Sequence, residues 1–413
     1  MIIRPYGRRQ KKPMVQTRTD DSIGDPGAPG LAGLHLDANR DRWRQRLRDV
    51  TSRDVEAALA TRPGSYRLDK LLALVSPAAE AYLEEMAQQS QSLTRQRFGR
   101  TIKLYAPLYL SSFCVNRCRY CGFSAANCFE RTRLTVDEAL ADAETLAREG
   151  FRDILLVSSE DRAFITVDYL AELAAKLRER FSFIGIEIYQ MATGEYRRLF
   201  EAGIEGVTLY QETYDRDEYA RQHPGGPKAD YDVRLRGPDD MAQAGMREIG
   251  LGVLLGLADW RIETLALGEH ASYLIRRYWR SHVSFSFPRL RPACGVTRDA
   301  FPHLLTDRHL VQMMLALRLC FADAGLVLST REEALFRDHV IALGPTRISA
   351  GSRTNPGGYS QADRGAGQFE VSDQRSSQEV AAMLARHGLE PVWKDWDGAF
   401  LGTDRPEAGG RRL

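Results

Sequence analysis

Hydrophobic positions follow two different spacings along this chain. Residues 39–100 carry apolar residues at helical spacing, and Pro77 stands where a helix would begin. From residue 103 onward, short runs rich in β-branched and aromatic residues alternate with longer amphipathic stretches. Because parallel strands need crossover helices, this second part predicts an α/β fold.

Eight of the short apolar runs are candidate strands. They cover residues 104–111, 153–158, 183–189, 206–212, 248–256, 283–290, 326–331 and 347–352. One helix between them begins with a capping box formed by Thr135 and Glu138. Eight strand–helix alternations predict a TIM-type (β/α)8 barrel with an N-terminal helical layer and a C-terminal cap. A doubly wound open sheet is the alternative.

The same spacing divides the chain into four ranges. Residues 1–38 contain RPYGRRQKK and GDPGAPG and are predicted to be a disordered tail, while an organelle-targeting peptide is disfavoured by the aspartates there. Residues 39–102 are the helical layer and residues 103–355 the barrel. Residues 356–413 form the cap or tail, with the helix candidate SQEVAAMLARHGL and the aromatic, charged segment PVWKDWD.

Composition excludes several classes of protein. The 413 residues are 43% hydrophobic and 27% charged, which is ordinary for a globular chain. Lys and Arg number 57 against 55 Asp and Glu, so no strong basic field for a nucleic-acid partner is expected. No apolar run has the length of a membrane span or a signal peptide, and six cysteines in so long a chain do not indicate a disulfide framework. We therefore predict a cytoplasmic protein in a reducing compartment.

Polar residues stand at the carboxyl ends of many predicted strands, where a buried strand would avoid them. In a barrel these ends share one rim, at which catalytic residues collect. The rim residues include Ser158, Ser159, Glu160, Gln211, Glu212, Arg289, Arg291, Arg331 and Ser349.

Three cysteines follow the first predicted strand in FCVNRCRYCGF, residues 113–123. Cys114, Cys118 and Cys121 are compatible with a zinc site completed by Cys128, with inert buried thiols, or with an iron–sulfur cluster. Three thiolates on a [4Fe–4S] cluster leave one iron without a protein ligand. That open iron could bind a substrate or cofactor directly.

The spacing C-x-x-x-C-x-x-C, with Tyr120 before the last cysteine, resembles the signature of the radical S-adenosylmethionine (SAM) enzymes. The resemblance implies a [4Fe–4S] cluster on Cys114, Cys118 and Cys121, with SAM on the open iron. One electron then cleaves SAM, and the 5′-deoxyadenosyl radical abstracts a hydrogen atom from the substrate.

Longer segments resemble the 2-iminoacetate synthases, the tyrosine lyases of thiamine biosynthesis: LYAPLYLSSFCVNRCRYCGFS, LYQETY, IGLGVLLGL, SFPRLRP, LSTRE, ISAGSRTNPGGY and PVWKDWD. This implies cleavage of the Cα–Cβ bond of L-tyrosine to 2-iminoacetate and p-cresol. The similar lyase that matures [FeFe]-hydrogenase has a second cluster on C-terminal cysteines, and this chain has none after Cys320. A tryptophan-type lyase and a non-enzymatic cluster or zinc redox sensor are the alternatives.

The resemblance also implies roles for single residues. Tyr120 contacts the adenine side of SAM, Glu160 and Glu212 bind its amine or ribose hydroxyls, and Arg234 pairs with its carboxylate.

Four further residues are implied for the substrate. Arg331 and Ser349 hold the carboxylate and amine of tyrosine, Tyr109 lines the same pocket, and Arg289 is a further candidate.

Two protein partners follow from the resemblance. One is the thiazole synthase subunit, which would accept 2-iminoacetate directly because this product hydrolyses readily, with PVWKDWD as the contact surface. The other is an electron donor of the flavodoxin or ferredoxin type.

Overall fold

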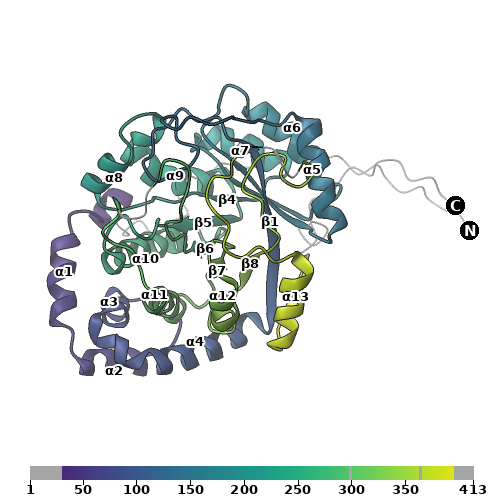
Figure 1. Ribbon diagram of the computed structural model, residues 1–413. Coiled ribbons are helices and arrows are strands. Elements are labelled where there is room, and N and C mark those ends of the chain that lie inside the picture. Colours follow the sequence, from purple (N-terminus) through teal and green to yellow (C-terminus); the bar gives the residue numbers. More distant parts are fainter. Residues whose placement is uncertain (1–29, 297–299, 362–364, 395–413) are drawn as a thin grey trace, which may run out of the picture.

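The computed structural model describes residues 30–296, 300–361 and 365–394. Eight parallel strands form a closed barrel, because β1 pairs with both β2 and β8 (Figure 1). The strands are β1 (Thr101–Ser111), β2 (Asp153–Ser158), β3 (Phe183–Glu187), β4 (Gly206–Thr208), β5 (Glu248–Gly252), β6 (His282–Ser286), β7 (Gly325–Leu328) and β8 (Arg347–Ser349). The predicted TIM-type barrel is confirmed, and the open-sheet alternative is wrong.

Strand β1 shows how the residue pattern separates the core from the site. Leu104, Leu108 and Leu110 belong to the large apolar cluster between the strands and the surrounding helices. Tyr105 and Tyr109 alternate with them and belong to a separate cluster inside the barrel. Successive side chains on a strand point to opposite faces, so one strand supplies both the packing surface and the wall of a cavity.

Helices surround the barrel (Figure 1). They are α5 (Val136–Arg148), α6 (Val167–Leu177), α7 (Thr193–Ala202), α8 (Arg216–Gln222), α9 (Tyr231–Ala244), α10 (Trp260–Arg277), α11 (Asp307–Cys320) and α12 (Ala334–Val340), with a short 3-10 helix at Pro227–Ala229. The capping box of Thr135 and Glu138 begins α5, as predicted. Among the described residues no helix is both long and apolar enough to cross a membrane.

A helical layer precedes the barrel and ends before β1 begins at Thr101. It consists of α1 (Arg40–Asp49), α2 (Ser52–Ala60), α3 (Leu68–Val75), a 3-10 helix (Pro77–Tyr82) and α4 (Leu83–Phe98). Helix α3 packs on α10 and α11, and α4 packs on α11 (Figure 1). The buried Arg40 fixes α1 to the barrel through ion pairs with Glu263 at 2.6 Å and Asp215 at 2.9 Å.

The expected disordered tail is wrong for its last residues. Leu31–Leu34 form a 3-10 helix, and Leu34 and Leu36 are buried in the main core because their apolar side chains pack against it. Residues 1–29 lie outside the described residues.

The C-terminal segment adds a helix and a strand to the barrel wall. Helix α13 (Ser377–Arg386) covers the predicted SQEVAAMLARHGL segment, and β9 (Glu390–Val392) pairs in parallel with residues 101–103 of β1. Trp393 packs edge-on against Phe151 with ring centroids 5.2 Å apart. This part of PVWKDWD is built into the fold, with Pro391, Val392 and Trp393 half-buried and Lys394 exposed, and residues 395–397 lie outside the described residues.

Charged side chains close the amino-terminal end of the barrel. Asp153 pairs with Lys103 at 2.6 Å and with Arg347 at 2.7 Å, and Arg347 also reaches Glu248 at 2.8 Å. These groups come from four different strands, so the network crosses the barrel interior. Cavities lined by barrel residues therefore lie toward the carboxyl ends of the strands.

Candidate active site

The cysteine loop that follows β1 is braced by one arginine. The Arg131 guanidinium donates to the backbone carbonyls of Ser112, Phe123, Ser124 and Asn127 at 2.5 to 3.2 Å. A guanidinium has five N–H groups in a fixed plane, so it can hold several turns of one loop at once. The loop is thereby ordered by the chain itself.

The loop presents three thiols to one cavity. Cys114, Cys118 and Cys121 line the same cavity, whereas Cys128 is exposed. Within the described residues, no three His, Cys, Asp or Glu side chains are arranged to hold a single metal ion. In a [4Fe–4S] cluster each thiolate binds a different iron, so the three thiols need not converge on one point.

Burial keeps the thiol at the centre of the motif protonated until a metal binds. The pKa of Cys118 is raised to about 12, chiefly because burial disfavours the thiolate. Cluster formation must therefore displace this proton, which couples metal loading to the loop structure.

The carboxylates and the arginine predicted for SAM lie in the same cavity as the thiols. Glu212, which follows β4, has a backbone φ of +70°, a conformation that non-glycine residues rarely adopt. Lys228 donates to its carboxylate at 2.6 Å, and Arg234 approaches it at 3.8 Å while donating to the Tyr210 carbonyl at 2.8 Å. Burial would raise the pKa of Glu212, but Lys228 and Arg234 outweigh it and hold that pKa below its usual value.

Two further predicted SAM residues line this cavity. Glu160 accepts hydrogen bonds from Asn116 at 3.0 Å and from Arg162 at 2.9 Å. The Tyr120 hydroxyl lies 2.7 Å from the His223 ring nitrogen. Burial and then Lys228 lower the pKa of His223 to about 3, so the imidazole ring in contact with Tyr120 is neutral.

A second cavity lies against the first. Both are lined by Val157, Glu187, Tyr210, Pro288, Arg331 and Phe369. Among the described residues, the charged ones that line it are Arg331 and Glu187, and the aromatic ones are Tyr105, Tyr109, Tyr210 and Phe369. Ser349 lines it as well, and its hydroxyl oxygen accepts the Thr330 N–H at 3.0 Å.

Arg331 is held in place by its neighbours. Its guanidinium carbon lies 3.4 Å from the Phe369 ring centroid, and it donates to the Arg289 carbonyl at 3.4 Å. Planar guanidinium groups stack on aromatic faces and keep their N–H edges available for a carboxylate. The structure therefore places Arg331 where an anionic group in the second cavity could be bound.

The structure does not bring Arg289 to either cavity. Its side chain is held by the buried Glu332 and by Asp307 at 2.7 Å, and Arg291 reaches the same Glu332 at 3.1 Å. An arginine that already neutralises buried acid has no free edge for a substrate. The prediction that Arg289 binds the substrate is therefore wrong. Its side chain instead supports the segment that carries Arg331.

Sequence reasoning missed several lining residues. Glu187 is the last residue of β3. It is a polar residue at the carboxyl end of a strand, like the predicted rim residues, so the same criterion could have found it. Lys228 lies in the short 3-10 helix at Pro227–Ala229, which has no periodic signal in the sequence. Gln368 lies far down the chain, and its amide is 3.7 Å from the Cys121 sulfur while its carbonyl accepts the Tyr109 hydroxyl at 2.8 Å.

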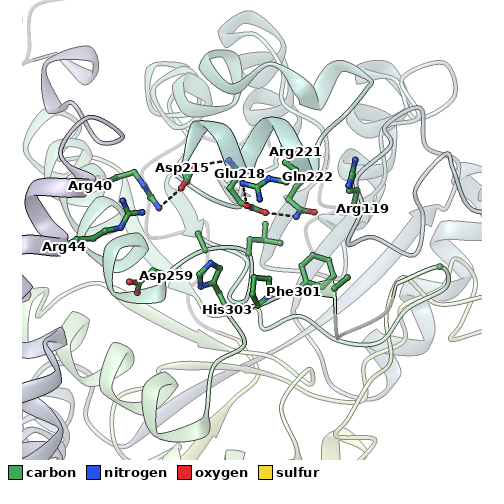
Figure 2. Close-up of a pocket in the computed structure, with 15 residues that line it drawn as sticks. Arg40, Arg44, Arg119, Asp215, Glu218, Arg221, Gln222, Asp259, Phe301 and His303 are labelled. Carbon is green, nitrogen blue, oxygen red and sulfur yellow. Dashed lines mark hydrogen bonds and ion pairs between the residues drawn. The ribbon is translucent and has the colours of Figure 1, made fainter.

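A third cavity lies outside this site (Figure 2). It is lined by Arg40, Arg44, Arg119, Asp215, Glu218 and Arg221 among others, and no thiol lines it. Arg119 belongs to the cysteine loop and contributes to the lining of this cavity. Its charges are mostly paired with one another, as in the 2.8 Å contact of Arg221 with Glu218.

Comparison with known proteins assigns the family. The Radical SAM superfamily matches residues 108–267, and the Biotin and Thiamin Synthesis associated domain matches residues 286–390. The 2-iminoacetate synthase of Escherichia coli (strain K12) is 44% identical over 371 residues, which are 88% of this chain and 97% of that protein. The chain belongs to the 2-iminoacetate synthase family. The 2-iminoacetate synthase of Salmonella typhimurium is 42% identical over the same shares of both chains.

Solved structures agree with this 2-iminoacetate synthase assignment. HydG, a maturase of the [FeFe]-hydrogenase, superposes with a TM-score of 0.81 at 33% identity, covering 86% of this chain and 80% of that one. As a radical SAM member of the 2-iminoacetate synthase family, the enzyme uses a [4Fe–4S] cluster and SAM. The three cysteines in one cavity fit the cluster, and the charged wall beside them fits an amino-acid-bearing cofactor.

Proposed function

We propose that this chain cleaves the Cα–Cβ bond of L-tyrosine to 2-iminoacetate and p-cresol, and that the second cavity binds the tyrosine. One observation carries the assignment of that cavity. An α-amino acid is a zwitterion, and in the part of the chain that the structure describes Arg331 and Glu187 are the one cation and the one anion in a lining rich in aromatic residues. A pocket with one charge of each sign and an apolar, aromatic remainder is suited to an aromatic amino acid.

The bound cofactors supply the radical chemistry. When bound, the cluster and SAM provide a 5′-deoxyadenosyl radical that takes a hydrogen atom from the substrate amine. We assign Cys114, Cys118 and Cys121 to the cluster. For SAM we assign Tyr120, Glu160, Glu212 and Arg234, all of which line the cavity that contains the thiols.

The chain's own residues orient the substrate and move one proton. Arg331 binds the substrate carboxylate through its free N–H edge, with Ser349 beside it. Glu187 accepts a proton from the substrate ammonium group. Burial raises the pKa of Glu187 although Arg331 opposes this, which makes it a better proton acceptor than an exposed carboxylate. Tyr109 limits the position of the aromatic ring.

Two partners complete the proposed function. The product passes to a thiazole synthase subunit of the thiamine pathway, which is supported by the match to the Biotin and Thiamin Synthesis associated domain. Because 2-iminoacetate is hydrolysed by water, direct transfer would preserve it. A separate electron carrier of the flavodoxin or ferredoxin type reduces the cluster.

The test is a product analysis under anaerobic conditions. The protein is reconstituted with iron and sulfide, reduced with dithionite and given SAM and tyrosine, and 5′-deoxyadenosine and p-cresol are quantified. We expect both products, and their joint loss in Cys118→Ala. 5′-Deoxyadenosine without p-cresol would reject tyrosine as the substrate, and an indole product from tryptophan would indicate the tryptophan-type alternative.

A further inference from the structure

The outer surface of the cysteine loop is formed by two chain segments that lie against each other. Arg117 N–H donates to the Gly225 carbonyl at 3.0 Å, and Arg119 N–H donates to the Gln222 carbonyl at 3.1 Å. Residues 115–119 and 221–228 therefore form one continuous surface, which we call the loop face. The thiols of Cys114 and Cys118 are directly behind it, lining the cluster cavity.

Exposed charge on the loop face has a single sign. The exposed charged side chains of these two segments are Arg117, Arg119 and Arg221, and neither segment contains Asp or Glu. Arg221 is paired with Glu218 at 2.8 Å, just before the second segment, so the uncompensated positive charge is that of Arg117 and Arg119. Arg117 and Arg119 have no ion-pair or hydrogen-bond partner for their side chains among the described residues. Arg119 and Arg221 lie at the same side of the third cavity (Figure 2).

Apolar groups accompany these cations. Val115 is 58% exposed, one of few large hydrophobic side chains so open among the described residues, and Pro224 and Pro227 are exposed beside it. A small apolar centre with arginines around it is the composition of protein interfaces.

The cluster needs an electron from outside the chain. Beyond the three cluster cysteines only Cys128, Cys294 and Cys320 remain, too few for a second four-thiolate cluster, and Cys320 is buried in α11. Electrons pass between proteins only when their redox groups come close. The carrier must therefore dock next to the cysteine loop.

From these observations we propose that the loop face is the docking site of an acidic one-electron carrier protein. The reduced carrier loses one electron and the cluster gains it. Carboxylates on the carrier pair with Arg117 and Arg119, while Val115 contacts an apolar patch around its redox group. Such encounters are small and short-lived, and opposite charges increase their association rate. This inference rests on the proposed function, because it presupposes a cluster that must be reduced.

Stopped-flow reduction of the cluster-loaded enzyme tests the docking site. Reduced flavodoxin serves as an acidic carrier, and the cluster absorbance is followed at low ionic strength in wild type and in the double variant Arg117→Glu/Arg119→Glu. We expect the second-order rate constant to fall at least about tenfold in the variant, with a weaker dependence on salt. Arg117→Gln/Arg119→Gln should give an intermediate loss.

Two controls separate docking from folding and from chemistry. Arg53→Glu reverses the charge of an exposed arginine on α2, outside the loop face, and should leave the rate constant unchanged. Turnover driven by excess dithionite should be the same in all variants, and its failure in wild type would instead reject the proposed function. Equal flavodoxin rate constants in wild type and the double variant, or an equal loss in Arg53→Glu, would overturn the docking site. A change of oligomeric state in the double variant at an unchanged flavodoxin rate would assign the loop face to self-association.

Discussion

The Tyr109 hydroxyl donates a 2.8 Å hydrogen bond to the side-chain carbonyl of Gln368, 259 residues further along the chain. The amide nitrogen of the same Gln368 lies 3.7 Å from the Cys121 sulfur. One side chain from the C-terminal segment therefore connects the wall of the proposed tyrosine cavity with a proposed cluster ligand. Gly122 makes room for this segment, because a Cβ atom at position 122 would lie 2.5 Å from the backbone carbonyl oxygen of Gln368.

Replacing Gln368 should affect both sites. Gln368→Leu removes an acceptor for Tyr109 and an N–H directed at a thiolate, and N–H groups near cluster sulfurs raise the reduction potential. We expect the KM for tyrosine to rise about fivefold, which is the effect of losing one neutral hydrogen bond. We also expect the reduction potential of the cluster to fall. Kinetics and an EPR-monitored redox titration measure the two effects.

Tyr109→Phe is the matched control for that variant. It removes the same hydrogen bond from the other partner and leaves the amide near Cys121 in place. It should therefore raise the KM for tyrosine without changing the potential. Equal potentials in Gln368→Leu and wild type would show that the Gln368 amide does not influence the cluster.

Arg331→Lys should impair tyrosine binding although it keeps the charge. A lysine ammonium cannot stack on Phe369 or bind a carboxylate with two parallel N–H groups. We expect kcat/KM for tyrosine to fall at least about 100-fold, while uncoupled 5′-deoxyadenosine formation without tyrosine persists. Arg291→Lys, which changes an arginine paired with Glu332, should have a smaller effect on kcat/KM. Similar losses in both variants would reject a specific role for Arg331.

Glu187 should control the acid side of the pH profile. Burial raises its pKa above the ordinary value of 4.5, so the carboxylate form that accepts the ammonium proton is lost at a higher pH than for an exposed glutamate. The kcat/KM for tyrosine should therefore fall as pH decreases through this raised pKa. Glu187→Gln should lower kcat/KM at neutral pH and remove that acid limb. An unchanged acid limb in Glu187→Gln would assign it to another group.

Cluster loading should distinguish the cysteines by position. Cys118→Ala should lose most of the bound iron and sulfide, and the visible absorbance that accompanies them, after reconstitution. Cys128→Ala and Cys294→Ala change exposed thiols and should load like wild type. Iron and sulfide assays make this comparison. If Cys128→Ala did not bind iron and sulfide, Cys128 would again be a candidate metal ligand.

Arg347→Met should destabilise the apo-protein strongly. It leaves Glu248 and Asp153 without a major partner inside the barrel, a change that costs about 3–5 kcal/mol in other proteins. Arg46→Met breaks an exposed pair with Asp69 and should cost under about 1 kcal/mol. Urea denaturation of both variants and wild type measures the difference.

The cost of Arg347→Met should depend on pH. Burial would raise the pKa of Glu248, but Arg347 and then Lys103 hold it below 4.5, so in wild type its contribution is present above that pH and is lost as pH falls. Without Arg347, burial acts with less opposition and the folded protein binds a proton more readily. The free-energy difference between variant and wild type should therefore shrink from pH 7 toward pH 4.5. A constant difference would show that lost packing, not charge, causes it.

Local sequence patterns determined the elements and the chemistry of this protein. Strand periodicity, the capping box of Thr135 and Glu138, and the spacing of Cys114, Cys118 and Cys121 all depend on residues a few positions apart. The strand-end rule then brought Glu160, Glu212, Arg331 and other polar residues to one rim, because parallel strands end on the same face of a barrel.

Only the tertiary structure decided which of the rim residues are available. Arg289 and Arg331 have similar positions after neighbouring strands, but Glu332 and Asp307 occupy the first, while Phe369 and a backbone carbonyl orient the second. Likewise, no local signal could bring Gln368 to Cys121 or β9 to β1. Such contacts depend on how distant segments pack and on which buried charges find partners, and these are properties of the whole fold and not of any short window of sequence.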